Sequence, residues 1–271
     1  MCGGSAVAWS PGTGTPSAVS GFAVDPQSRA DVLSFYNCVY NQSESYASHV
    51  NWTGDVTAGV AGTTGAVFKE DVRRRINFYR ALAGVDADIA FDETLSAKDQ
   101  QAALIFAANL NLSHTVTGTW THYTADGAEA AAHSNVSIQW GDRFAAVKCY
   151  GPPAVDTYIF DSGDSVNSTE NRAVGHRRWI LYPPQQTMGT GDIPPTQVTR
   201  SGTVYAVSAN AIWINGPYKS SYEAKAVPWP AAGYFPFPLM PSRWSFTCPG
   251  ADFSGASVTM TLGGTALGGS I

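Results

Sequence analysis

Five histidines are the side chains in this sequence best suited to bind a metal ion or to transfer a proton at neutral pH. They are His49, His114, His122, His133 and His176. A histidine without an informative context is usually a surface or hydrogen-bonded side chain, so most of the five need no chemical role. Two have a more informative context. His114 directly follows the predicted end of a helix, and His176 stands between a glycine and an apolar, strand-like run that ends at Leu181.

The motifs of several common enzyme classes do not occur in the sequence. It contains no HExxH, GxSxG or GxxxxGK[ST], and no GxGxxG follows a predicted strand. The four cysteines are Cys2, Cys38, Cys149 and Cys248, which are far apart and form no CxxC pair. This spacing argues against a zinc ribbon or a dithiol redox site and leaves disulfide formation open.

The elements that must position the two histidines follow from hydrophobic spacing. Apolar residues recur every three to four positions over residues 29–40, 65–83 and 153–161, which predicts three amphipathic helices. Gly84 is placed to end the second of these, and Asp92 to cap a further helix that fades near residue 111. Lys98 interrupts the apolar stripe of that helix, so its stem should lie along the apolar face. We expect Arg73, Arg74 and Arg75 to lie on a solvated helix face.

The second half of the chain has the shorter repeat that is typical of strands. Residues 203–214 alternate β-branched and aromatic side chains, which predicts a strand or a hairpin, and residues 244–248 and 257–262 predict two more strands. Residues 227–241 are rich in proline and aromatics, which indicates an ordered loop wrapped on the domain. The chain ends within what resembles the middle of a β-rich module, so we expect further sequence after it.

Six segments, in order over residues 65–215, resemble the CAP superfamily of cysteine-rich secretory, antigen 5 and pathogenesis-related proteins. Ile76-Asn77-Phe78-Tyr79-Arg80 resembles the family's opening helix, Phe91 to Ser96 the start of its second helix, and Leu112-Ser113-His114 its first cleft histidine. Gly127-Ala128-Glu129 is similar to the segment of the first cleft acid, with one extra residue. Ala154 to Asp161 resembles the next helix, and Gly175-His176-Arg177 matches the bacterial form of the second histidine motif.

The resemblance implies an α+β fold, a CAP-type α-β-α sandwich with additional C-terminal β-strands. It implies a cleft in which His114 and His176 bind a weakly held divalent metal, zinc in the first place or copper, beside the acids Glu129 and Asp161. Asp161 stands where the eukaryotic pattern has a glutamate, whose side chain is one methylene longer. The few cysteines resemble the family's bacterial branch. A hydrogen-bonded polar cluster without metal is the alternative interpretation of the same four residues.

We expect the function of an extracellular binding module for a metal, a small hydrophobic ligand such as a lipid, or a protein partner. Two alternatives remain open. In a metal-dependent, protease-like hydrolase, Glu129 and His176 would be catalytic, with Ser113 suited to a serine-based version. In a cell-surface adhesion or structural module, the cleft would have no role.

The composition of the chain indicates which partners and which location to expect. The 271-residue chain has a formal net charge of -5 and only 14% charged residues, so it lacks the basic surface that nucleic acids require. No apolar run is long enough to span a membrane. Five glycosylation sequons fit a secreted or cell-surface protein, and Met1-Cys2-Gly3 suggests a lipid anchor at Cys2. We expect a disordered tail over residues 1–21, a CAP domain with an N-terminal helical extension over 22–225, and an aromatic, proline-rich loop with strands over 226–271.

Overall fold

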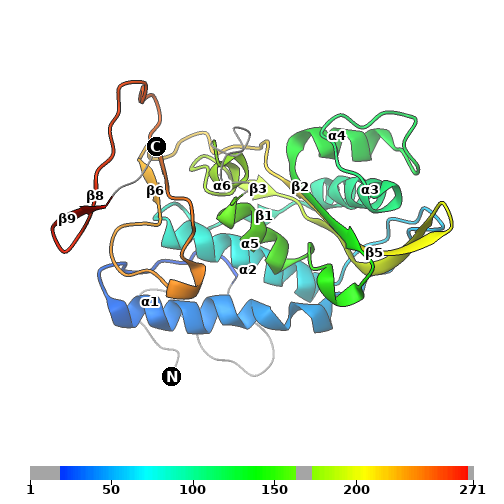
Figure 1. Cartoon of the computed structure of the whole chain (residues 1–271), viewed down its shortest axis with the longest axis horizontal. Coiled ribbons are helices and arrows are strands. Elements are labelled where there is room, and N and C mark those ends of the chain that lie inside the picture. Colours follow the sequence, from blue (N-terminus) through cyan, green and yellow to red (C-terminus); the bar gives the residue numbers. More distant parts are fainter. Residues whose placement is uncertain (1–18, 163–172, 268–271) are drawn as a thin grey trace.

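The computed structural model describes residues 19–162 and 173–267 and has a mixed, α+β fold (Figure 1). Its helical elements are α1 (Arg29–Phe35), η1 (Tyr36–Tyr40), η2 (Asn41–His49), α2 (Ala66–Leu82), α3 (Glu93–Asn109), α4 (Ala125–His133), η3 (Phe144–Ala146), α5 (Pro152–Phe160), α6 (Gly175–Ile180) and η5 (Phe237–Leu239). Its strands are β1 (Ala90–Phe91), β2 (Ser134–Gly141), β3 (Thr187–Met188), β4 (Gly191–Arg200), β5 (Thr203–Trp213), β6 (Val227–Trp229), β7 (Ser245–Thr247), β8 (Met260–Leu262) and β9 (Thr265–Leu267).

A three-stranded antiparallel sheet in the order β2-β5-β4 lies between two groups of helices. Because successive side chains of a strand point to opposite faces, Val207, Ala209 and Ala211 of β5 pack in one core with α3 and α4. Ser208 and Asn210 lie on the other face, where the Tyr158 hydroxyl of α5 hydrogen-bonds to Asn210. Helices α2 and α5 share a second core with Ile212 of β5.

The close packing of α3 against the sheet depends on Gly191 at the start of β4. A Cβ atom at this position would lie 2.1 Å from the backbone of Asp99 in α3, so a larger residue would push the helix away. Gln100 of α3 fixes the same contact with two hydrogen bonds to the backbone of Asp192 in β4. The helix and the sheet are therefore held in one relative position.

The strongest periodic patterns predicted their elements correctly. The helix expected over residues 65–83 is α2, and Gly84 follows it with a left-handed φ of 72°. Asp92 caps α3 by accepting a hydrogen bond from the Leu95 amide. Lys98 extends from α3 to ion pairs with the carboxylates of α4. The expected strand over 203–214 is β5, which forms a hairpin with β4.

Three other expectations were wrong in detail. The apolar run after His176 is the helix α6, which contacts α5 and buries Arg177 and Ile180, three positions apart on one helix face. The helix expected over 29–40 continues through η1 and η2 to His49. The tail expected over residues 1–21 includes described residues that are ordered, since Val19 is buried and its carbonyl accepts a hydrogen bond from Asn77.

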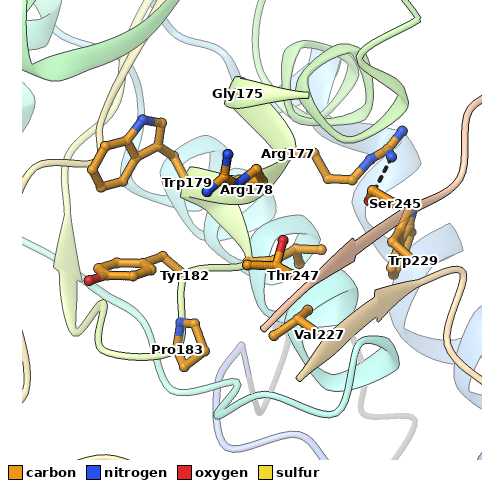
Figure 2. Close-up of a pocket in the computed structure, with 11 residues that line it drawn as sticks. Gly175, Arg177, Arg178, Trp179, Tyr182, Pro183, Val227, Trp229, Ser245 and Thr247 are labelled. Carbon is orange, nitrogen blue, oxygen red and sulfur yellow. Dashed lines mark hydrogen bonds between the residues drawn. The ribbon is translucent and has the colours of Figure 1, made fainter. Parts of the chain in front are cut away.

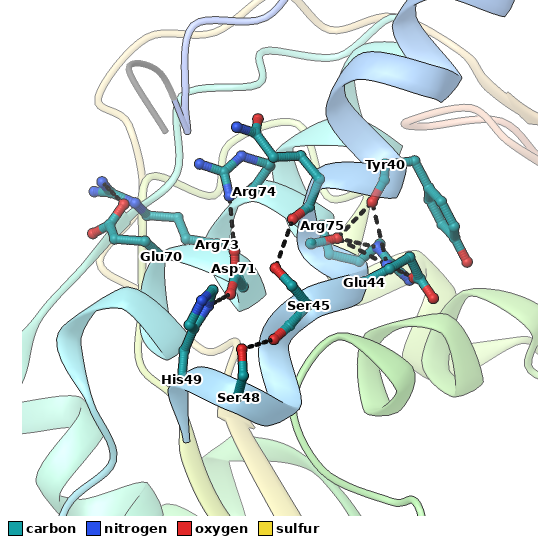
Figure 3. A network of polar contacts seen from close by, with 12 residues as sticks. Tyr40, Glu44, Ser45, Ser48, His49, Glu70, Asp71, Arg73, Arg74 and Arg75 are labelled. Atoms are coloured by element: carbon teal, nitrogen blue, oxygen red, sulfur yellow. Dashed lines mark hydrogen bonds and ion pairs between the residues drawn. The ribbon is translucent and has the colours of Figure 1, made fainter. Parts of the chain in front are cut away.

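The expected solvated face of α2 is also wrong, because Arg74 and Arg75 are completely buried. Figure 3 shows these arginines between α2 and the helical segment η1–η2, where Arg74 pairs with Asp71 and Arg75 with Glu44. Arg75 also lies 2.5 Å from Asp156 of α5. The arginines are buried because α2 is enclosed by other elements and each cation finds a carboxylate there.

The C-terminal part extends from the packed layers and ends in the exposed hairpin β8–β9 (Figure 1). The expected ordered loop begins with β6, which pairs with β7 and buries Trp229. Phe237 of the same loop is 84% exposed, so the loop is only partly packed. Cys38 forms a disulfide, whereas Cys149 and Cys248 carry free thiols. The lipid anchor expected at Cys2 lies outside the described residues.

Candidate functional site

His114 and His176, the two histidines singled out from the sequence, line one surface hollow of about 340 Å³. We call it the histidine cleft. His114 comes from the loop between α3 and α4, and His176 from the first turn of α6. The cleft is completed by Ala132, Ser134, Asn135, Ala173, Gly175, Trp179, Ile214 and Asn215. Two imidazoles separated by 62 positions in the chain therefore face the same space.

A buried carboxylate orients the ring of His176. Nδ1 of His176 lies 3.0 Å from Oδ1 of Asp161, whose side chain is only 2% exposed. The other carboxylate oxygen accepts a hydrogen bond from the Arg177 amide. The imidazole also stacks on the ring of Tyr158, with 5.4 Å between the ring centroids. Because the carboxylate accepts, Nδ1 carries the proton, and the neutral ring has its lone pair on Nε2.

A backbone carbonyl orients the ring of His114. Its Nδ1 lies 2.6 Å from the carbonyl oxygen of Ala131 in α4. A carbonyl can only accept, so the proton of the neutral ring again sits on Nδ1 and the lone pair on Nε2. Within residues 19–162 and 173–267, Nε2 of neither histidine has a hydrogen-bond partner. Both rings thus have the tautomer that suits a metal ligand or a hydrogen-bond acceptor.

The first acid suggested by the resemblance, Glu129, is placed elsewhere. Its carboxylate lies 2.6 Å from the ammonium of Lys98 and does not line the histidine cleft. Asp161 does not line the cleft directly, but it contacts the cleft through His176. The structure therefore brings together three of the four proposed residues, and Glu129 belongs to an ion pair between α4 and α3.

The donor set of the histidine cleft suits a weakly held metal ion. The cleft offers two imidazole nitrogens whose opposite ring nitrogens are already hydrogen-bonded, as is typical of histidines that bind zinc. Among the described residues, no cluster of three or more His, Cys, Asp or Glu side chains could hold a metal ion. A cation here would take two protein ligands, and water or a bound molecule would supply the others.

Arg177, the residue after His176, is buried and holds the site together. Its guanidinium donates hydrogen bonds to the carbonyl oxygens of Ile159, Phe160 and Arg243. The first two carbonyls belong to the last turn of α5, directly before Asp161. Burial lowers the pKa of Arg177 to about 10, which still leaves it charged at neutral pH. Arg177 thereby links the end of α5 to α6 and positions Asp161 against His176.

Sequence reasoning missed two residues that position His176. The side-chain amide of Asn135 donates a hydrogen bond to the carbonyl oxygen of His176, and the only signal at Asn135 in the sequence is one of the five sequons. Asn135 is only 3% exposed, so this sequon is not accessible in the folded protein. The stacking of Tyr158 on His176 also had no sequence signal, because it depends on how α5 packs against α6.

None of the family models scanned matches the chain, and no curated protein matches it either.

Proposed function

We propose that this chain is an extracellular binding module with a CAP-type fold, whose histidine cleft binds a labile divalent cation through Nε2 of His114 and His176. The observation that carries the proposal is the shared hollow, in which both rings have their Nδ1 proton held by a fixed oxygen. Zinc and copper both accept neutral imidazole ligands, with zinc as the first candidate and copper as the second. With two protein ligands, binding should be weak and exchangeable.

The sandwich arrangement and the extracellular location belong to the same proposal. The sheet between two helical groups supports the CAP-type fold. The disulfide at Cys38 supports an oxidising compartment, because disulfides rarely persist in the cytosol. Within the described residues, no helix is long and apolar enough to cross a membrane.

We do not extend the proposal to hydrolysis. The hydrolase interpretation requires Glu129 as general base at the cation, and its carboxylate is engaged by Lys98. A general base must lie within hydrogen-bond reach of the water that it activates, directly or through one more water. No contact of Ser113 favours a serine mechanism, since its hydroxyl bonds to the backbone of Thr115. Likewise, no contact of the cleft favours the adhesion interpretation.

The test is calorimetric titration of metal-stripped protein with zinc and with copper. We expect one site per chain in the native protein and loss of that site in the double variant His114→Ala, His176→Ala. His122→Asn is the matched control: it removes an imidazole bound to Val56, and asparagine tolerates the left-handed backbone at φ 60°. Equal heats for the native protein and the double variant would overturn the metal site.

A second variant tests the role of Asp161. Asp161→Asn keeps the shape of the side chain and its left-handed backbone at φ 42°, but removes the charge that holds the His176 proton. Loss of such a partner typically weakens metal affinity by 10–100-fold, so we expect a weaker site with unchanged stoichiometry. Zinc affinity equal to that of the native protein would show that Asp161 does not orient the ligand.

A further inference from the structure

A second cavity adjoins the histidine cleft across helix α6. It has a volume of about 260 Å³ and lies between α6, the segment after it and the paired strands β6 and β7 (Figure 2). Its apolar lining comes from Trp179, Leu181, Tyr182, Pro183, Val227 and Trp229. We call it the aromatic cavity. Gly175 and Trp179 line both the aromatic cavity and the histidine cleft, so the two sites share a wall.

Packed aromatic rings form the walls of this cavity. Trp179 and Tyr182 meet edge to face, with 5.6 Å between their ring centroids. Trp229 is 1% exposed and meets both Tyr79 and Phe235 edge to face. Rings that are fixed in this way keep the cavity open without a ligand. Such a cavity suits a rigid, flat and apolar group.

The polar groups of the aromatic cavity are cations and hydrogen-bond donors. Arg177 and Arg178 both line it, and no carboxylate of the described residues does, although the whole chain has a net charge of -5. The hydroxyl of Ser245 accepts a hydrogen bond from Arg177, which leaves its own proton free to donate. This donor-rich lining favours a ligand that carries negative charge.

Arg178 is the cation available to such a ligand. The buried Arg177 already donates to backbone carbonyls, whereas Arg178 is exposed and has no ion pair or hydrogen bond in the described part of the chain. Figure 2 shows its side chain next to Trp179, with Thr247 directed into the cavity. Arg178 and Thr247 also line an adjoining hollow that contains Lys225. An unpaired guanidinium beside an apolar cavity binds carboxylates with charge-assisted hydrogen bonds.

We propose that the aromatic cavity binds a small aromatic carboxylate, with its ring between Trp179, Tyr182 and Trp229 and its carboxylate on Arg178. The size of the cavity fits one ring with a short chain, and the unpaired cation selects the acid over a neutral analogue. This site is independent of the proposed metal site, because it needs neither His114 nor His176. The ligand class follows from an aromatic wall, a free guanidinium and, among the described residues, no lining carboxylate.

The test uses 3-phenylpropionate as the probe and 3-phenylpropan-1-ol as the uncharged match, with binding measured by tryptophan fluorescence and calorimetry. We expect the native protein to bind the acid about tenfold more tightly than the alcohol. Arg178→Gln should remove that preference, whereas Arg143→Gln, which changes an exposed arginine that lines none of these hollows, should keep it. Thr247→Phe should weaken both probes, because its ring fills the cavity.

Three results would overturn the proposal. They are no binding of the acid by the native protein, no preference for the acid over the alcohol, and an unchanged preference in Arg178→Gln. The double variant His114→Ala, His176→Ala separates this proposal from the metal site, because it should bind 3-phenylpropionate like the native protein. If that variant no longer bound 3-phenylpropionate, the two sites would not be independent. Circular dichroism of each variant checks that the fold is intact.

Discussion

The buried carboxylate of Asp99 should make the stability of the protein depend steeply on pH. Asp99 lies on α3 with 0% exposure, and burial raises its pKa to about 8 from an ordinary value of 3.8. Its oxygens accept hydrogen bonds from the Ser134 hydroxyl and the Trp213 amide. At a pH between these two pKa values, Asp99 is protonated in the folded protein and deprotonated in the unfolded chain. Stability from this group is therefore complete below about pH 4 and is lost as the pH rises toward 8.

Asp99→Asn removes this titration and keeps both contacts, since its amide can accept from Trp213 and donate to Ser134. Relative to the native protein, the variant should gain about 1.4 kcal/mol of unfolding free energy per pH unit across this window. From pH 5 to pH 8 the relative gain amounts to about 3–4 kcal/mol. Asp192, another buried carboxylate with a raised pKa, is present in both proteins, so most of its contribution cancels.

The assay is urea unfolding of both proteins at pH 5, 6, 7 and 8, with the free energy of unfolding extrapolated to water. Asp142→Asn, which changes an exposed carboxylate, is the matched control and should follow the native pH profile. A constant difference between Asp99→Asn and the native protein over the four pH values would refute the reasoning. It would mean that Asp99 has the same protonation in the folded and unfolded states throughout this range.

Three further predictions concern stability, and chemical denaturation measures each. Arg177→Met should lower the free energy of unfolding by about 3 kcal/mol, because it leaves the carbonyl oxygens at the end of α5 without their donor. A loss of less than about 1 kcal/mol would show that water replaces the guanidinium. Arg75→Met should cost about 3 kcal/mol by leaving Asp156 without its cation, and a neutral effect would contradict that pairing. Trp229→Ala should cost about 3–5 kcal/mol, whereas Phe237→Ala, at an 84% exposed position of the same loop, should change stability by less than about 0.5 kcal/mol.

The elements that could be predicted are those whose local pattern agrees with their packing. Helix α2 has an apolar stripe and a glycine at its end, and α3 has an aspartate cap, so both followed from short-range rules. Strand β2 was missed, although the alternation of Val136, Ile138 and Trp140 is a period-two signal. The burial of Arg75 could not be predicted from its own helix, because its partner Asp156 is 81 positions away.

The candidate site could be predicted only in part, for a related reason. The types and neighbours of His114 and His176 drew attention to them, but their pairing was suggested by a family resemblance and not by the local sequence. Glu129 was assigned to the cleft because of its position in a motif. In the structure, its carboxylate instead pairs with Lys98 on another helix. Which carboxylate approaches which imidazole depends on the packing of α4, α5 and α6. Local spacing contains no information about that packing.

The conformation of residues 175–180 determines which side chains can share a ligand. In a strand, His176 and Arg178 would point to the same face and would act on one molecule. In the helix α6, side chains two positions apart point about 200° apart, so His176 lines the histidine cleft and Arg178 the aromatic cavity. Arg177 points inward between them and binds α5, and Trp179 forms the wall that both sites share. A helix of six residues thus separates the proposed cation site from the proposed anion site.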